Sequence, residues 1–229
     1  MTMPSDASSG VPAPPADRDS LACSHEARRH LLSLFPGGLG RGEFYELRAL
    51  DCSHSPAVPG PRLYFRSITE LADEAMRLRE SWDVFFGVGL RRCPMSDDIA
   101  KCSHDEKGKD HVSRLTCAWG DFDVSPIETP KTPYRSQAQV VAALEAAELR
   151  PDILVSSGSG VHGYWLLDEP STDLQRVEAL NRAIRGKLGG DNAIDAARIL
   201  RLAGTYNRKR PTPELVRLVR CSREQSSHA

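Results

Sequence analysis

The sequence predicts a single α/β domain built on a mixed sheet. Apolar runs of strand length recur along the chain, at residues 83–90, 115–123, 153–157 and 161–167. Segments with helical spacing of apolar residues, or with capping residues at their starts, lie between them, at 67–80, 136–149 and 172–188. A chain of 229 residues, 40% of them hydrophobic and 27% charged, is long enough for one substantial core. Such alternation is typical of an α/β or α+β domain.

The N-terminal part predicts a tail followed by a short helix and two strands. Residues 1–24 are rich in Pro, Ser and Ala, so they cannot bury enough apolar surface to fold and are expected to be disordered. The folded domain is therefore placed at residues 25–221. An amphipathic helix is predicted at 26–35, before a Pro-Gly-Gly sequence, and strands are predicted at 44–50 and 62–66.

The middle of the chain predicts a helix, a buried strand and an exposed insertion. Ser67 and Glu70 form a capping box that opens the helix, which extends to about residue 80. After the strand at 83–90, residues 92–113 are polar and charged and have no period, so they predict an insertion on the surface.

The C-terminal part predicts two helices that flank a hairpin. The helix at 136–149 is followed by two strands around a tight glycine turn. Thr172 and Gln175 form a second capping box, and the helix they open ends at a Gly-Gly pair. A last strand is predicted at 215–219, and residues 222–229 predict a flexible tail.

Composition excludes several classes of protein. No apolar run is long enough for a membrane span, and the N-terminus has no signal peptide, so no membrane partner is expected. The six cysteines include no CxxC pair, which favours reduced thiols in a cytoplasmic protein. The chain also has no Walker A pattern and therefore no helicase motor.

Residues 119–123, here called the acidic strand, contain two carboxylates that are separated by one residue. Residues i and i+2 of a strand face the same side, so Asp121 and Asp123 project together while Phe122 points into the core. Two carboxylates this close repel each other unless a cation lies between them, and hard Mg²⁺ or Mn²⁺ accepts oxygen ligands of this kind. The alternative is a pair of acids at the exposed end of a strand.

Residues 156–165, here called the glycine turn, formally match GxGxxG. A dinucleotide fingerprint needs a helix after the third glycine, whereas here the chain continues as a strand to Leu167. The better interpretation is a strand-turn-strand element whose backbone amides, with Ser157, Ser159 and His162, approach a triphosphate. A structural role for the histidine is the alternative.

Residues 195–209, here called the arginine segment, combine an acid with several cations. Asp195 can supply a third carboxylate, although Asp191 is a rival for that role and a helix-capping role is the alternative. Seven Lys or Arg residues lie between positions 198 and 220 against one acid, Glu214, which predicts a basic surface for nucleic-acid phosphates.

The three segments together resemble the motifs of the archaeo-eukaryotic primase superfamily, particularly the primase-polymerase domains of plasmid replication proteins and of phage or mobile-element primase-helicases. The first motif, an apolar strand ending in D-x-D or D-x-E, is matched by residues 118–123. The second, a turn of serine and glycine ending in histidine, is matched by 156–162, and the third, an acid followed by R-x-L-R-L-P-G-T-x-N-x-K, by 195–209. Ala203 stands where many relatives carry proline.

The resemblance spans about residues 43–220 and implies a two-lobed α/β fold with an RRM-like catalytic half. It implies a DNA-templated primase-polymerase that uses Mg²⁺ or Mn²⁺, NTPs or dNTPs and a single-stranded DNA template, with a replicative helicase as a further partner, in the cytoplasm of a bacterium or of a phage-infected host. Residues with expected catalytic roles are Asp121, Asp123, Asp195 and His162, the three acids also as metal ligands. Expected nucleotide-binding residues are Ser157, Ser159, His162, Arg91, Arg198 and Lys209. Expected nucleic-acid-binding residues are Arg201, Arg208 and Arg210.

Zinc is a second metal that the sequence raises. Cysteines and histidines cluster around the 92–113 insertion, at Cys93, Cys102, His104 and His111. Their spacing differs from that of a common zinc knuckle, and nearby Cys117 lies in a predicted buried strand, where a core role is expected.

Two other functions stay open at the level of sequence. One is a metal-dependent nucleotidyltransferase or nuclease that does not prime. The other is a single-strand-binding or origin-binding replication module without catalysis. Ribonucleotide or deoxyribonucleotide preference, initiation sequence and oligomeric state are not encoded in any of these motifs.

Overall fold

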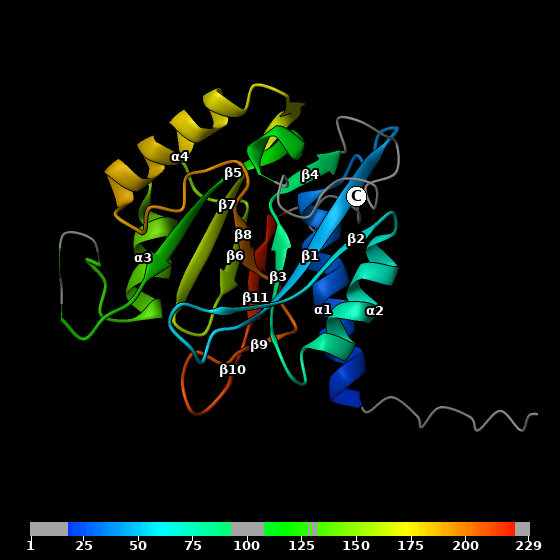
Figure 1. Cartoon of the computed structure of the whole chain (residues 1–229). Coiled ribbons are helices and arrows are strands. Elements are labelled where there is room, and N and C mark those ends of the chain that lie inside the picture. Colours follow the sequence, from blue (N-terminus) through cyan, green and yellow to red (C-terminus); the bar gives the residue numbers. More distant parts are fainter. Residues whose placement is uncertain (1–17, 93–107, 128, 130–131, 223–229) are drawn as a thin grey trace, which may run out of the picture.

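The computed structural model describes residues 18–92, 108–127, 129 and 132–222, which form a sheet flanked by helices (Figure 1). The helices of this part of the chain are α1 (Arg18–Leu34), α2 (Ile68–Leu78), α3 (Gln137–Ala146) and α4 (Leu174–Leu188), with a 3₁₀ turn at Lys109–His111. The longer strands are β1 (Glu43–Asp51), β2 (Val58–Phe65), β3 (Asp83–Gly87), β4 (Gly89–Arg92), β5 (Val112–Asp123), β6 (Ile153–Ser156), β7 (Gly160–Ser171) and β11 (Arg217–Cys221). The shorter strands are β8 (Ile199–Arg201), β9 (Tyr206–Asn207) and β10 (Glu214–Leu215).

The main sheet has nine strands in the order β11-β6-β7-β5-β4-β1-β3-β8, with β2 paired to β1; β9 and β10 form a separate pair. The α/β class predicted from the sequence is confirmed. The expectation of mixed sheets is corrected, because every pairing between these named strands is antiparallel. Hairpins such as β1–β2 and β6–β7 account for part of this, since a short turn joins only antiparallel neighbours.

The sheet divides into two halves at Val88. β3 and β4 flank this residue and pair with different parts of the same edge of β1. On their other edge, β3 pairs with β8 whereas β4 pairs with β5. The backbone amide of Val88 donates to the carbonyl of Arg198 across the division. One interrupted strand therefore connects the half that carries β1, β2, β3 and β8 to the half that carries β5, β6, β7 and β11, in agreement with the predicted two-lobed arrangement.

The helices cover different faces of the sheet. On β7, Tyr164 contacts His30 of α1, whereas the next residue, Trp165, lies in an apolar cavity beside α3 and α4. Neighbouring residues of a strand point to opposite faces, so α1 and the α3–α4 pair lie on opposite sides of β7. In the other half, α2 lies against β1, β2 and β3, while α1 packs beside α2 and contacts Phe86 of β3 through His30 (Figure 1).

Helix α1 begins earlier than the sequence predicted. It starts at Arg18, inside the segment expected to be disordered to residue 24, and Cys23, Ala27 and Leu31 are buried along one face. The spacing i, i+4, i+8 is the helical stripe, but the polar residues between these positions concealed it. The rest of the predicted tail lies outside the described residues.

The ends of the predicted insertion also belong to the fold. His111 and Val112 are buried, and β5 begins at Val112 rather than at residue 115. Val112 fits here because its side chain packs where Gly89 of β4 leaves room. Residues 93–107 lie outside the described part. At the other end of the chain, Ser222 still donates its amide to the carbonyl of Asp152, and 223–229 lie outside the described residues.

The central strand β5 is held by contacts at its apolar residues. The backbone amide of Trp119 donates to Asn181 of α4 at 2.9 Å, and its indole donates to the carbonyl of Ala193 at 2.6 Å. Phe122 is completely buried. Neighbouring residues of a strand point to opposite faces, so the burial of Phe122 fixes the face to which the two flanking aspartates must point.

The close approach of β7 to β5 requires a glycine at position 160. A Cβ atom there would lie 2.4 Å from the carbonyl oxygen of Phe122. We expect Gly160→Ala to lower the free energy of unfolding by about 1–3 kcal/mol, because backbone atoms must shift to relieve the clash. In contrast, a Cβ at Gly186 of α4 meets nothing within 4 Å. Gly186→Ala should raise the free energy of unfolding by about 0.5–1 kcal/mol. Urea unfolding of both variants measures the difference, and equal effects of the two substitutions would contradict the packing.

Candidate active site

The two aspartates of the acidic strand lie side by side on one face of β5. Asp121 pairs in register with His162 of β7, and Asp123 pairs with Gly160. Residues opposite each other on antiparallel strands point to the same face. The predicted meeting of the acidic strand with the glycine turn is therefore a direct consequence of strand pairing.

The electrostatic environment disfavours negative charge on both carboxyl groups. Burial and the charge of Asp191 raise the pKa of Asp121 to about 6. The pKa of Asp123 is also raised, first by burial and then by the charge of Asp121. Carboxylates in this situation are stabilised by a nearby cation. A hard divalent ion would therefore stabilise this arrangement.

His162 is buried and uncharged at neutral pH. Burial, with a smaller contribution from the charge of Arg201, lowers its pKa to about 3. Its Nε2 lies 3.6 Å from Oδ1 of Asp121, and the hydroxyl of Tyr164 lies 3.5 Å from its Nδ1. An imidazole whose Nδ1 accepts from Tyr164 carries its proton on Nε2, where it can donate to an anionic ligand beside Asp121.

The glycine turn forms the hairpin between β6 and β7 that the sequence favoured over a dinucleotide fold. The amide of Ser157 donates to the carbonyl of Gly160 at 2.9 Å, and Gly158 has a φ of +85°, which side-chain-bearing residues rarely adopt. The amide of Val124 donates to the carbonyl of Ser159, which ties the turn to the end of the acidic strand. Ser157 is buried, while Ser159 lines a cavity next to Asp123.

Asn207 connects the glycine turn to the arginine segment, a role that the sequence analysis missed. Its side-chain amide donates to the carbonyl of Ser157 at 2.7 Å and to the hydroxyl of Ser159 at 3.3 Å, and its Oδ1 accepts from the amide of Lys209. The only sequence signal was its place within the third motif. The pairing could not be predicted because the partners are 48 and 50 residues away.

The third carboxylate beside the acidic strand is that of Asp191. Its amide donates to the carbonyl of Asp121 at 2.8 Å, and its charge raises the pKa of both Asp121 and Asp123. Asp195, the residue first expected there, is half-exposed and forms an ion pair with Arg198 at 2.9 Å. Asp195 is not among the largest contributors to the pKa of either acid. Asp191 follows the Gly189-Gly190 end of α4, and this end of the helix places Asp191 closer to β5 than Asp195.

Three cations of the arginine segment surround the acids. Arg198, Arg201 and Lys209 each lower the pKa of Asp121 and thereby offset part of the carboxylate repulsion. Lys209 lies in a cavity of about 330 Å³ that Asp123, Ser159 and Arg210 also line. This cavity brings residues of all three motifs together and is large enough for part of a phosphate chain.

Other expected phosphate and nucleic-acid ligands are already engaged within the protein. Arg91 is buried and forms an ion pair with Glu46 at 2.6 Å. Arg208 donates to the carbonyls of Arg79 and Glu80 at 2.6 and 2.7 Å, which ties its chain to the end of α2. Such contacts support a structural role for both arginines.

Arg201 and Arg210 occupy different environments from each other. Arg201 is buried and forms an ion pair with Asp83, with its guanidinium 4.7 Å from the centre of the Phe85 ring. Arg210 is largely exposed and pairs with Glu214 at 3.1 Å. Of these two expected nucleic-acid ligands, Arg210 lies on the surface and Arg201 faces the acids.

Three solved structures have the same arrangement of elements. The primase-polymerase domain of cyanophage S-2L matches with a TM-score of 0.58 and 17% identity, over 85% of this chain and 88% of that domain. The chain has the archaeo-eukaryotic primase fold. The structure of primase RepB′ matches with a TM-score of 0.56 and 15% identity, over 87% of this chain and 57% of that one. The catalytic domain of RepB′ in complex with initiator DNA gives 0.54 and 13%, over 86% of each chain. No family model and no curated protein matches the sequence.

Within this primase fold, the described residues include no group of three or more His, Cys, Asp or Glu side chains already close enough to hold a metal ion. Three of the four expected zinc ligands, Cys93, Cys102 and His104, lie outside the described residues, and His111 is buried. Cys117 is buried as expected, and burial raises the pKa of its thiol to about 12. No helix in the described ranges is both long and apolar enough to cross a membrane.

The raised pKa of Asp121 predicts a pH-dependent effect on stability. Its folded-state pKa of about 6 lies above the ordinary value of 3.8, so ionisation costs stability as the pH rises through this interval. Asp121→Asn removes that cost. Because the side chain is 23% exposed, we expect a gain of no more than about 2 kcal/mol at pH 8.

Thermal melts of wild type and Asp121→Asn, without divalent metal, measure this effect. The gain should shrink below pH 6 and vanish only well below pH 3.8, where the carboxyl group is protonated in both the folded and the unfolded protein. A gain of the same size at pH 4 and pH 8 would show that the carboxylate is not the cause.

Proposed function

We propose that this protein is a DNA-templated primase-polymerase, which makes primers from NTPs or dNTPs by nucleotidyl transfer. The observation that supports this most directly is the register of β5 and β7, which sets Asp121 opposite the neutral His162 and places Asp123, which lines the phosphate-sized cavity, on the same face. The shared fold with primase-polymerases adds to the support. Neither observation depends on the other.

The carboxylates of Asp121, Asp123 and Asp191 are the groups that would hold Mg²⁺ or Mn²⁺. When bound, such ions supply charge neutralisation and activation of a 3′-hydroxyl in phosphoryl transfer. Asp191 enters this proposal in place of Asp195, because it is Asp191 whose charge acts on the other two acids. Because the three carboxylates repel one another, a cation bound between them is stabilised.

Neutral and cationic donors would bind the phosphates of the incoming nucleotide. His162 carries no charge at neutral pH, so it donates a hydrogen bond from Nε2 without attracting the carboxylate of Asp121 away from a metal. Lys209 and the hydroxyl of Ser159 line the cavity next to Asp123 and would contact the same phosphates. Arg210, at the outer side of this cavity, is suited to the template strand.

Single-stranded DNA is the template that fits this proposal. One of the structural neighbours is described in complex with initiator DNA. A replicative helicase remains part of the proposal as a partner.

Unprimed synthesis on single-stranded DNA tests the function. With Mg²⁺ or Mn²⁺, the full-length protein should produce new oligonucleotides from an NTP or dNTP mixture, and EDTA should abolish the reaction. Asp123→Asn should lower the rate by roughly a hundredfold or more, because it removes a charge from the reaction centre. Its fold and its affinity for single-stranded DNA should be retained. Binding without synthesis by the wild-type protein would favour a binding module, and degradation of the template would favour a nuclease.

Asp191 and Asp195 form a matched pair that tests the assignment of the third carboxylate. Asp191→Asn should lower synthesis by roughly a hundredfold, whereas Asp195→Asn should have an effect below about fivefold. The pKa of Asp121, measured by NMR without metal, should fall in Asp191→Asn and stay unchanged in Asp195→Asn. A severe loss of synthesis in Asp195→Asn alone would return the role to that residue.

A further inference from the structure

A transverse row of residues crosses four strands of the half that carries β1 and β2. Arg62 of β2 lies opposite Arg48 of β1, and Arg48 lies opposite Phe85 of β3. Phe85 in turn lies opposite Arg201 of β8. Directly opposed residues in antiparallel strands point to the same face of the sheet. The side chains of Arg62, Arg48, Phe85 and Arg201, here called the arginine row, therefore share one face.

This face is the one that α1 and α2 leave uncovered. Leu47 and Phe86, next to members of the row, point to the opposite face and are completely or almost completely buried beneath the helices. Arg48 and Phe85, by contrast, are only half-buried. A half-exposed aromatic ring between arginines is not required by the core, which lies on the other side of the sheet.

Positive charge on this face exceeds negative charge. Two carboxylates, Glu46 and Asp83, face four arginines, which are Arg48, Arg62, Arg91 and Arg201. Glu46 is fully shared between Arg62 and Arg91, at 2.7 and 2.6 Å. Arg48 makes no hydrogen bond or salt bridge with any other described residue, and its pKa is lowered by burial and by the charge of Arg62.

Like charges directly opposite each other on neighbouring strands are destabilising. The opposed pair of Arg48 and Arg62 is therefore unfavourable in the protein alone. An anion bound between the two guanidinium groups would reverse the sign of that interaction, because each arginine presents a planar set of donors to a phosphate.

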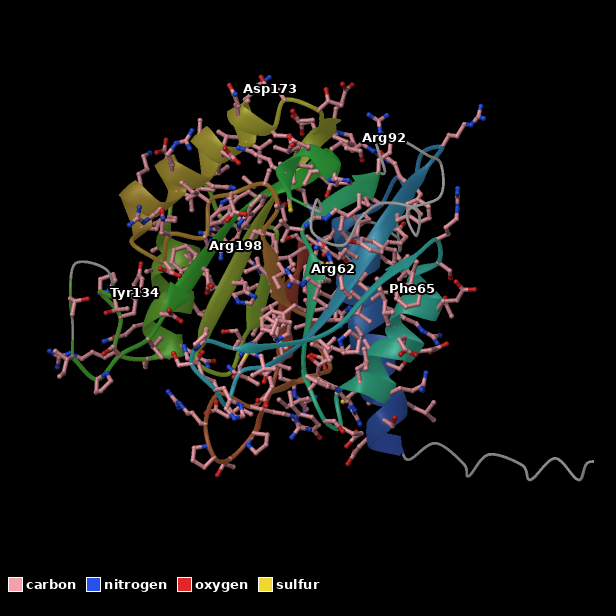
Figure 2. All side chains as sticks on the ribbon, viewed as in Figure 1. Arg62, Phe65, Arg92, Tyr134, Asp173 and Arg198 are labelled. Atoms are coloured by element: carbon pink, nitrogen blue, oxygen red, sulfur yellow. The ribbon has the colours of Figure 1, made fainter. Side chains whose placement is uncertain are left out.

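The row leads directly to the candidate active site. Arg201, at its inner end, lowers the pKa of Asp121, Asp123 and His162, so its guanidinium lies within electrostatic range of all three. Arg62, at the outer end, and Arg198, beside the acids, both lie in the central part of the view in Figure 2. The spacing of strands, about 4.8 Å, makes the row about 14 Å long, or two to three nucleotides of an extended single strand.

We propose that the arginine row is a binding track for single-stranded DNA, with Arg48 and Arg62 holding backbone phosphates and Phe85 stacking against a base. Proteins that bind single strands without sequence preference commonly combine basic residues along the DNA backbone with aromatic rings that stack on the bases. This inference rests on the proposed function for the identity of the strand, but its geometry is independent of the catalytic acids.

Fluorescence anisotropy with a labelled oligonucleotide of mixed sequence, without metal or nucleotide, tests the track on the full chain. Arg48→Gln should weaken binding by about three- to tenfold and reduce the slope of log affinity against log salt by about 0.7, the loss of one phosphate contact to a single strand. Phe85→Leu should weaken binding to a similar extent without changing that slope, because it removes stacking but no charge.

Arg77→Gln is the matched control, because Arg77 lies on α2 with a side chain that is 78% exposed. It removes the same charge from the helix-covered side and should leave both affinity and slope unchanged. The melting temperature of Arg48→Gln should not fall, because the substitution relieves repulsion from Arg62. A lower melting temperature together with unchanged DNA binding would overturn the proposal and leave the row a structural feature.

The outcome is separable from that of the proposed function. If Arg48→Gln binds DNA more weakly and the wild-type protein synthesises nothing, the track is supported and the primase is rejected. If Arg48→Gln binds DNA as tightly as the wild-type protein and the wild-type protein does prime, only the track is rejected. If Arg48→Gln weakened only the binding of free nucleotides, the row would belong to the triphosphate and the strand assignment would be wrong.

Discussion

The register between β5 and β7 is the constraint on which the rest of the site depends. It sets Asp121 opposite His162 and Asp123 opposite Gly160, across a contact so close that a Cβ at position 160 would collide with the backbone of β5. A slip of one residue would turn both acids toward the buried side and Phe122 toward solvent. The contacts of Trp119 with Asn181 and Ala193 oppose such a slip, because Trp119 shares the face of the two aspartates and is held in place on the same strand.

Electrostatic repulsion is built into this arrangement rather than avoided. Burial raises the pKa of Asp121 and Asp123, and the charge of Asp191 adds to the effect on both, as the charge of Asp121 does on Asp123. Arg198, Arg201 and Lys209 offset part of this cost, although Arg198 forms its ion pair with Asp195 and Arg201 forms its ion pair with Asp83. A site of this kind is less stable than a fully paired one, and the balance favours the binding of further cations and of anionic phosphates.

Arg201 interacts with residues of both halves of the sheet. Its ion pair with Asp83 and its contact with Phe85 hold it on β3, while its charge acts on the acids of β5. The interruption of the sheet at Val88 makes this possible, since it allows β8 to pair with β3 while the preceding residue, Arg198, bonds to Val88. One short strand therefore relates the arginine row to the catalytic residues.

Local patterns in the sequence determined the α/β class, most elements, the pair of acids on one strand face, and the hairpin that carries His162. Each follows from periodicity or turn chemistry over a few residues. The start of α1, the internal contacts of Arg91 and Arg208, the proximity of Asp191 rather than Asp195, and the role of Asn207 were decided only by the tertiary structure. Their partners are distant in sequence or belong to other elements, and no local pattern encodes a contact such as that between Asn207 and Ser157, 50 residues apart. The arginine row shows the same limit, because its four members come from four strands and meet only through the register of the sheet.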